Sequence, residues 1–243
     1  MKNDLIVIIP AYEPTREFIQ YALAVSERAR RVVIVNDGSS EAFDGIFGEI
    51  AKIENVVYLK HEKNLGKGCA LKTAFAYCVA HFESDAVIVT ADCDGQHAVE
   101  DVSRVGAAVT EGVDRLVLGS RDFTLANIPP KSQIGNRIFR RAFRFFYRKK
   151  VYDTQTGLRG FSVALAKEFA AVKGKRFEYE MTVLIYAKKN GLDIFELPIQ
   201  TIYPDEPKDH ATHYRPIKDT LKIYSVVLKN LWMRKNPSRK KKR

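Results

Sequence analysis

The sequence predicts an α/β fold, a single domain with a mainly parallel central sheet and helices on both faces. Short apolar runs rich in Val and Ile alternate with helix-length segments at the spacing of βαβ units. The early runs each end in polar, turn-forming residues, and ligands bind at that edge of an open parallel sheet. A chain of 243 residues, 46% of them hydrophobic, is long and apolar enough to fill one sizeable core.

Three strands and two helices are predicted in the first 60 residues. The apolar runs at residues 5–9, 32–35 and 56–59 have the length and the β-branched side chains of strands. We expect Pro10 to end the first strand, and a helix to follow from about Thr15 to Arg30 with Thr15 as its N-cap. A second helix leads from the second strand to the third.

The rest of the chain continues this alternation. Asn64-Leu65-Gly66-Lys67-Gly68 opens a helix that runs to about Phe82, and residues 86–90 form a buried central strand. A helix near 98–111, a strand at 115–121 and a strand-like run at 194–202 follow. Residues 221–233 predict a C-terminal amphipathic helix, too short and too charged to span a membrane.

Two carboxylates follow the predicted central strand. Asp92 and Asp94 are one residue apart, and alternate residues of an extended chain point the same way, so both can face one divalent cation. A plain strand-to-turn junction is the alternative, because Asp and Gly are ordinary turn residues.

The ends of two other strands carry side chains suited to a nucleotide sugar. Tyr12 offers a ring to stack on a base, and Asp37 offers a carboxylate to a base or a ribose. A partly buried loop aromatic and a turn-forming Asp are the alternatives. Lys67 stands between Gly66 and Gly68 without the spacing of a phosphate loop, and supplies a local positive charge.

The formal net charge of +11 is concentrated in two segments. Residues 137–150 and the last ten residues each hold about seven Arg and Lys and no acidic residue, which leaves roughly −3 for the rest of the chain. Such segments meet nucleic acid or an anionic membrane surface. Three cysteines without metal-ligand spacing indicate a reducing, cytoplasmic compartment, and the N-terminus reads as a strand rather than a signal peptide.

Five motifs in this order carry a resemblance: Pro-Ala-Tyr, Asn-Asp-Gly-Ser-Ser, Asn-Leu-Gly-Lys-Gly, Asp-Cys-Asp-Gly-Gln-His and Gly-Ser-Arg. Over about residues 4–225 the chain resembles the family 2 glycosyltransferases with a GT-A (Rossmann-like) fold. Residues 153–161 and 176–180 resemble the polyprenyl-phosphate subgroup, which includes dolichyl-phosphate mannose synthase and GtrB-type enzymes. The implied organisation is a catalytic domain at 1–212, then an acceptor-side loop, amphipathic helix and polybasic tail at 213–243.

The resemblance implies an inverting enzyme and a role for each motif residue. The metal, Mg²⁺ or Mn²⁺, would be held by Asp92, Asp94 and Gln96 against the donor diphosphate, with Asp94 and Arg121 in the catalytic machinery. Pro14 and Thr201 depart from the mannose synthase pattern, so a UDP-sugar is favoured over GDP-mannose as donor. The remaining implied substrate-binding residues are Pro10, Tyr12, Glu13, Asp37, Lys67, Ser132, Asn136 and Arg137.

The expected acceptor is a polyprenyl phosphate. A lipid phosphate is already ionised near neutral pH and needs cations rather than a general base. If a base exists, Asp153, Glu178 and Glu180 are the candidates; their alternative role is to fix a loop or pair with Arg159 or Arg176. Arg215, between the last strand-like run and the amphipathic segment, is expected to bind the acceptor phosphate, with a solvated loop arginine as the alternative.

The basic segments favour an anionic membrane surface over nucleic acid as a partner. Phe139, Ala142, Phe143 and Phe146 recur at helical spacing with arginines between them, as in helices that lie in a membrane interface. A core helix with a solvated basic face is the alternative. We expect a cytoplasmic protein, peripherally bound to the inner face of the cell membrane, that can form a homo-oligomer. A glycosyltransferase acting on a sugar hydroxyl of a polysaccharide is the competing function.

Overall fold

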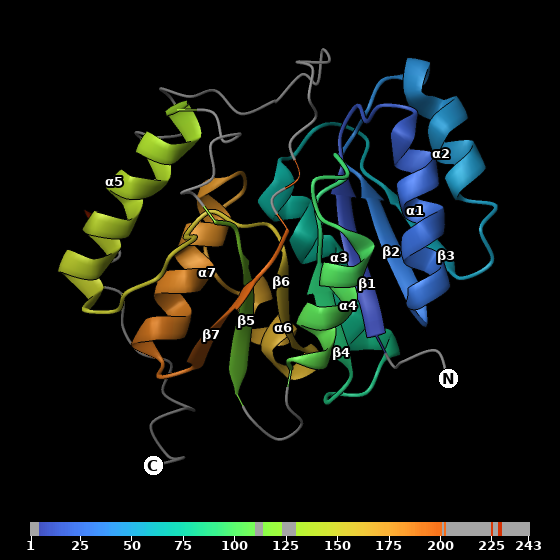
Figure 1. Ribbon diagram of the computed structural model, residues 1–243. Coiled ribbons are helices and arrows are strands. Elements are labelled where there is room, and N and C mark those ends of the chain that lie inside the picture. Colours follow the sequence, from blue (N-terminus) through green and yellow to red (C-terminus); the bar gives the residue numbers. More distant parts are fainter. Residues whose placement is uncertain are drawn as a thin grey trace.

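The computed structural model describes residues 5–109, 114–122, 130–200, 202, 225 and 228–229. A seven-stranded sheet runs through the molecule in the order β3-β2-β1-β4-β6-β5-β7 (Figure 1). All neighbouring strands are parallel except β6, which is antiparallel to both β4 and β5. The predicted mainly parallel α/β sheet is therefore confirmed.

The first five strands and the helices between them alternate as the apolar runs predicted, whereas no element was predicted at residues 159–170 and 178–189. The bounds are β1 Leu5–Ala11, α1 Glu17–Arg28, β2 Arg31–Asn36, η1 Glu41–Phe43, α2 Asp44–Ile50, β3 Val56–Lys60, α3 Lys67–His81, β4 Val87–Thr90, α4 Val99–Ala107, β5 Arg115–Ser120, α5 Pro130–Tyr147, β6 Arg159–Ser162, α6 Val163–Ala170, α7 Glu178–Lys189 and β7 Asp193–Pro198.

Two boundaries near the N-terminus differ from the prediction. Strand β1 continues through Pro10 to Ala11, because Pro10 lies beyond the residues that pair with β4 and its missing N–H costs no ladder bond there. Helix α1 begins at Glu17, and its N-cap position is Arg16 without a side-chain cap. Thr15 instead accepts the amide of Phe18 through its backbone carbonyl, so the expected Thr15 side-chain cap is wrong.

The sheet separates two hydrophobic cores. Helices α3, α5, α6 and α7 pack on one face, against the side chains of Ile6, Ile8 and their neighbours. Helices α1, α2 and α4 pack on the other face, against Val7, Ile9 and theirs. Alternate residues of β1 thus enter opposite cores, and the strand is buried along its whole length. Strand β1 pairs with β4 in the middle of the sheet (Figure 1).

Strand β6 was not predicted. It has four residues, Arg-Gly-Phe-Ser, which give no apolar run and no period-2 alternation. Its place in the sheet depends on tertiary packing: Gly160 lies so close to Val105 of α4 that a methyl group there would come within 2.9 Å of the Val105 side chain. The chain reversal at β6 brings residues 153–158 to the end of β4, where Asp92 follows.

Helix α5 turns its aromatic stripe to the protein core. Phe139, Phe143 and Tyr147 are at most 6% exposed and belong to the core that also contains α3, α6 and α7. The reading of this stripe as a membrane-facing surface is therefore wrong, because these rings already have protein partners. Phe145, on the opposite side, is 79% exposed beside the exposed Arg144.

The acceptor-side segment lies largely outside the described residues. Arg215 and most of residues 221–233 lie outside the described part of the chain, and so do Thr201 and the expected boundary at residue 212. Within the described part of the chain, no helix is long and apolar enough to cross a membrane.

Candidate active site

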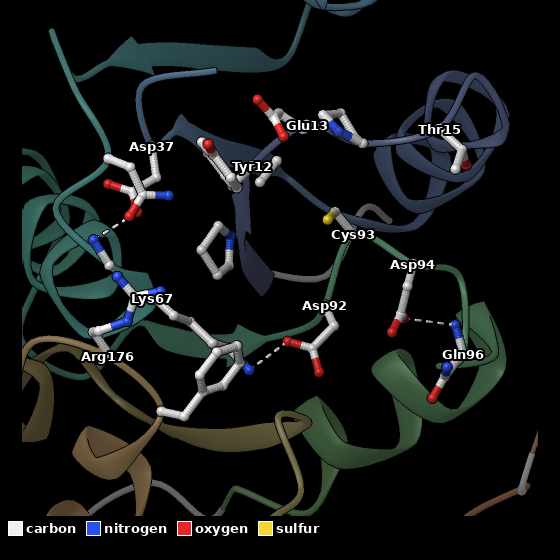
Figure 2. A pocket seen from close by; sticks show the side chains of 16 residues that line it. Tyr12, Glu13, Thr15, Asp37, Lys67, Asp92, Cys93, Asp94, Gln96 and Arg176 are labelled. Atoms are coloured by element: carbon white, nitrogen blue, oxygen red, sulfur yellow. Dashed lines mark hydrogen bonds and ion pairs between the residues drawn. The ribbon is translucent and has the colours of Figure 1, made fainter. Parts of the chain in front are cut away.

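A pocket of about 250 Å³ opens at the carboxyl ends of β1, β2 and β4. This is the edge of a parallel sheet where ligands are expected, at the point where chain connections diverge from β1. Figure 2 shows Tyr12 and Asp37 near one end of the pocket, and Asp94 with Gln96 at the other. The lining residues are Pro10, Ala11, Tyr12, Glu13, Pro14, Thr15, Asp37, Asn64, Gly66, Lys67, Asp92, Cys93, Asp94, Gln96, Arg176 and Phe177.

Asp37 is buried and organises the loop that precedes α3. Its Oδ1 accepts the amide of Leu65 at 3.0 Å and its Oδ2 accepts the amide of Gly66 at 2.7 Å. The ring of His61 lies 2.8 Å from Oδ1, and its other nitrogen lies 2.9 Å from Thr73. The carboxylate therefore shapes the loop as well as lining the pocket.

Tyr12 and Glu13 are carried by a strained turn after β1. Glu13 has a φ of 49°, which is uncommon for a residue other than glycine, and its amide donates to Ser39 Oγ at 2.8 Å. Burial and the neighbouring Glu13 raise the pKa of Tyr12. Arg176 lies across the pocket from Tyr12, so an aromatic ring and a guanidinium border the same space (Figure 2).

Asp92 is held on both oxygens. Lys67 Nζ lies 2.6 Å from Oδ1, and Nε2 of the buried His97 lies 3.4 Å from Oδ2. Burial alone would raise the pKa of Asp92, but the ammonium of Lys67 and the ring of His97 outweigh it, so this pKa lies well below its usual value. A methyl group at Gly157 would lie 2.7 Å from Oδ1 and closer still to Oδ2, so the glycine leaves room for the carboxylate.

Asp94 lies beside Asp92 at the Gln96 end of the pocket. Its Oδ1 accepts the amide of Gln96 at 3.0 Å, which turns the chain at Gly95 with a φ of 72°. Burial and the nearby charge of Asp92 raise the pKa of Asp94. Two neighbouring carboxylates that repel each other in this way form a site that a divalent cation stabilises.

The donor set suits a metal that is completed by substrate. Among the residues that the structure describes, no group of three or more His, Cys, Asp and Glu could hold a metal ion by itself. Mg²⁺ in phosphate-handling sites takes only one or two carboxylates and fills its shell with phosphate oxygens and water. Asp92, Asp94 and the amide oxygen of Gln96 fit that pattern.

Lys67 joins Asp92 to helix α7. Its Nζ also lies 3.0 Å from Oε1 of Glu180, which is 8% exposed. Burial would lower the pKa of Lys67, but Asp92 and Glu180 raise it above its ordinary value. The backbone carbonyl of Glu180 accepts a hydrogen bond from Arg159 Nη1 at 2.7 Å, so Arg159 fixes this part of α7.

Arg121 is paired with a buried carboxylate outside the pocket lining. Its Nε donates to Oδ2 of Asp153 at 2.7 Å, and its Nη2 donates to Oδ1 at 3.3 Å. Glu196 accepts the amides of Tyr152 and Asp153 and so fixes the loop that carries Asp153. Asp153 therefore pairs with Arg121, whereas the alternative to a base role named Arg159 or Arg176 as its partner.

The predicted acceptor-side residues are described only in part. Asn136 is 1% exposed; its Nδ2 donates to the carbonyl of Tyr152, and its Oδ1 accepts the amide of Thr154. Its observed contacts are thus with the loop before β6. Arg137 is exposed on α5, the side chain of Ser132 is outside the described residues, and so is Arg215.

Four site residues had no role assigned from the sequence. His97 belongs to a motif, but nothing in the pattern showed that it would contact Asp92. Gly157 and Arg176 come from segments distant in sequence, brought in by the unpredicted β6 and by α7. Asn64 lines the pocket with a buried Oδ1 that has no hydrogen-bond partner within the described structure. Long-range packing, which a local pattern does not encode, places these side chains.

The parallel sheet, the pocket at its carboxyl edge and the paired carboxylates after β4 define a glycosyltransferase of the GT-A type. The model of the family described as "Glycosyl transferase family 2" matches residues 6–175. The chain belongs to this family, as its motifs predicted.

Similar proteins in other organisms carry related names. UDP-N-acetylglucosamine–dolichyl-phosphate N-acetylglucosaminyltransferase of Methanococcus voltae is 32% identical over 235 residues, covering 88% of this chain and 92% of the relative. Polyprenol monophosphomannose synthase of Mycolicibacterium smegmatis is 27% identical over 203 residues, covering 80% and 76%.

A solved structure shares the fold. Glucosyl-3-phosphoglycerate synthase from Mycobacterium tuberculosis, in complex with Mn²⁺, UDP and phosphoglyceric acid, superposes with a TM-score of 0.70 at 15% identity. The match covers 96% of this chain and 80% of that one. The likeness at this level of identity concerns the arrangement of the chain.

Proposed function

We propose that this glycosyltransferase is metal-dependent and inverting, and transfers a sugar from a nucleotide sugar to a polyprenyl phosphate. A UDP-sugar is the favoured donor, and the cytoplasmic face of the membrane is the proposed place of reaction. The observation that carries the proposal is the pair Asp92 and Asp94, one residue apart at the end of β4 on the wall of the pocket.

The relatives support both substrates. The name of the Methanococcus voltae relative specifies a UDP-sugar donor and a dolichyl-phosphate acceptor, and that of the Mycolicibacterium relative a polyprenol product. The structural neighbour was solved with UDP and either Mn²⁺ or Mg²⁺. Nucleotide binding is further supported by Asn64, whose buried Oδ1 offers an acceptor to a base or ribose donor.

The chain's own residues supply binding and orientation. Asp92, Asp94 and Gln96 would hold Mg²⁺ or Mn²⁺, which when bound neutralises the charge that gathers on the leaving diphosphate. Tyr12, Asp37 and Arg176 border the space proposed for the nucleoside. A phosphate nucleophile is already ionised, so this scheme uses no carboxylate as a general base.

Cations on the acceptor side would position the lipid phosphate. Arg121 is held in a fixed orientation by Asp153 and is proposed to meet phosphate charge. Arg215, from the part of the chain outside the described residues, is proposed to do the same. The exposed arginines of α5 and the exposed ring of Phe145 are proposed to contact an anionic membrane surface.

A matrix of donors and acceptors tests the proposal. UDP-glucose, UDP-galactose, UDP-N-acetylglucosamine and GDP-mannose would each be offered with undecaprenyl or dolichyl phosphate in the presence of Mg²⁺ or Mn²⁺. We expect a lipid-extractable, phosphate-linked sugar from a UDP-sugar, and its loss with EDTA.

A variant tests the metal directly. Asp94→Asn should lower turnover by about two or more orders of magnitude, because the negative charge of the leaving diphosphate loses its counter-ion. Unchanged rates in EDTA would remove the metal from this account. Transfer to a polysaccharide hydroxyl and not to lipid phosphate would favour the competing function.

A further inference from the structure

Lys67 stands between two carboxylates that belong to different parts of the fold. Its Nζ lies 2.6 Å from Oδ1 of Asp92, which follows β4, and 3.0 Å from Oε1 of Glu180 in α7. All three side chains are largely buried: that of Lys67 is 17% exposed, that of Asp92 28% and that of Glu180 10%. Figure 2 shows the Lys67 side chain reaching across the pocket to Asp92.

Asp92 has little freedom to move away from this contact. His97, which is 3% exposed, approaches Oδ2, and Gly157 packs directly against the carboxylate. The ammonium group of Lys67, in contrast, stands at the end of a flexible four-carbon side chain. If a cation binds Asp92, the ammonium is therefore the group that can move.

Glu180 is positioned to keep the ammonium when that happens. The turn that carries Lys67 is docked on the start of α7: Cys69 donates its amide to the carbonyl of Lys175, and Gly68 lies against Tyr179. Arg159 holds the carbonyl of Glu180. Lys67 thus has a second anion within reach whose position does not depend on Asp92.

We propose that the cation and Lys67 exchange at Asp92, with Glu180 as the anion that retains Lys67 when the cation is bound. Lys67 neutralises Asp92 in the empty site, and Glu180 is a positioning residue that acts through Lys67. The local charges agree with this exchange, because the three carboxylates of Asp92, Asp94 and Glu180 outnumber the cations of Lys67 and Arg159 and leave negative charge for a divalent cation to neutralise. The inference rests on the proposed metal site at Asp92 and Asp94.

The test is the affinity of the full-length protein for Mn²⁺ alone, measured by electron paramagnetic resonance and by calorimetry without any sugar donor. Lys67→Met should bind Mn²⁺ about five- to tenfold more tightly than wild type, because Asp92 is released. Glu180→Gln should bind Mn²⁺ about five- to tenfold more weakly than wild type, because Asp92 is then the anion that remains for Lys67. Glu178→Gln removes a carboxylate from the same turn of α7, one that accepts the amide of Lys175, and should leave the affinity within about twofold.

The double variant separates exchange from simple charge addition. In the Lys67→Met background, Glu180→Gln should lose most of its effect, since Glu180 acts through Lys67. Additive effects of the two substitutions would overturn the exchange, and so would a Lys67→Met protein that binds Mn²⁺ no more tightly than wild type. Lys67→Gln, which keeps a hydrogen-bond donor but no charge, replaces Lys67→Met if circular dichroism shows that the latter does not fold.

A further variant tests the proposed metal site separately from the exchange. Asp94→Asn should lose Mn²⁺ binding whatever Lys67 does, and failure of that variant to do so would contradict the metal site itself. Loss in Asp94→Asn together with additive effects at Lys67 and Glu180 would keep the metal site and reject the exchange.

Discussion

At the scale of single residues, the position of Asp92, a proposed metal ligand, depends on the absence of one side chain. Gly157 comes from the loop before β6, and its Cα faces the carboxylate of Asp92. A side chain at this position would push Asp92 away from the orientation that His97 and Lys67 support. Geometry at Asp92 is thus set by a residue about 65 positions away in the chain.

Gly157→Ala should weaken Mn²⁺ binding and lower turnover by about tenfold or more, because a methyl group would displace Asp92. Mn²⁺ titration and steady-state kinetics provide the measurement. Gly45→Ala in α2 is the matched control, since a methyl group there meets nothing within 4 Å. Wild-type affinity in Gly157→Ala would show that Asp92 tolerates the shift.

Glu178→Gln should keep turnover within about threefold of wild type, because the proposed phosphate nucleophile needs no general base. In the structure its Oε1 accepts the amide of Lys175, which is the role of a loop-fixing residue. Turnover at saturating Mn²⁺ is the measurement. A folded Glu178→Gln protein as inactive as Asp94→Asn would establish a catalytic carboxylate.

The individual residues differed in how well sequence could predict them. Tyr12, Asp37, Asp92 and Asp94 follow apolar strands, so the rule that parallel strands share one ligand-binding edge places them correctly in the pocket. What each carboxylate would contact was not predictable. The Asp37 interactions with residues 65 and 66, and the Lys67 bridge to Glu180, depend on how loops and helices from distant segments meet.

At the scale of elements, helix α5 combines a buried aromatic face with an exposed cationic one. Phe143 is fully buried, while Arg141 and Arg144 are exposed. Amphipathic spacing alone does not distinguish a core-packed helix from one lying in a membrane interface, because both need an apolar face and a polar one. The aromatic face proved to be core, which leaves the arginines and Phe145 for any lipid contact.

Substitutions on the two faces of α5 should have different effects, one on stability and the other on membrane binding. Phe143→Ala should lower the free energy of unfolding by about 3–5 kcal/mol, measured by denaturant titration, because it leaves a cavity in the core. Arg141→Glu with Arg144→Glu should leave stability nearly unchanged and weaken binding to phosphatidylglycerol vesicles by about tenfold or more.

The control for the charge reversal is Arg16→Glu with Arg28→Glu. Both arginines are exposed at the ends of α1, a helix that packs on the opposite face of the sheet. Equal loss of vesicle binding in the two double variants would show that net charge, and not α5, governs membrane contact.

The strands that were predicted from the sequence are those with a continuous apolar run. Strands β1 to β5 have apolar runs that need no tertiary information. Strand β6 is held by its neighbours rather than by its composition, and its antiparallel direction could not be read from four residues. Helix starts were less predictable, since α1 begins without the side-chain cap that Thr15 suggested.

At the scale of the whole molecule, charge and fold are distributed differently. The net charge of +11 comes from residues 137–150, which include the second half of α5, and from the last ten residues, while the rest of the chain carries roughly −3. The cationic part of the chain thus lies after the metal motif in sequence. Donor binding and acceptor binding are proposed to use these two parts respectively.

Arg215→Ala should raise the apparent KM for lipid phosphate by about tenfold and leave UDP binding unchanged, because the proposed contact is with the acceptor alone. Arg215→Lys should recover only part of the loss, since the planar guanidinium is gone. Steady-state kinetics with the lipid varied, and UDP calorimetry, make the comparison. Wild-type lipid kinetics in both variants would return Arg215 to an ordinary loop residue.

The double use of Asp37 has a consequence for how donor preference can change. One carboxylate borders the nucleoside end of the pocket and also fixes residues 65 and 66, next to Lys67. A substitution that adapts the pocket to another base would therefore disturb the diphosphate end in the same step. Under the proposed function, an evolutionary change of donor base therefore requires matched changes in the loop at 61–66. Recognition of the base and binding of the diphosphate would then change together.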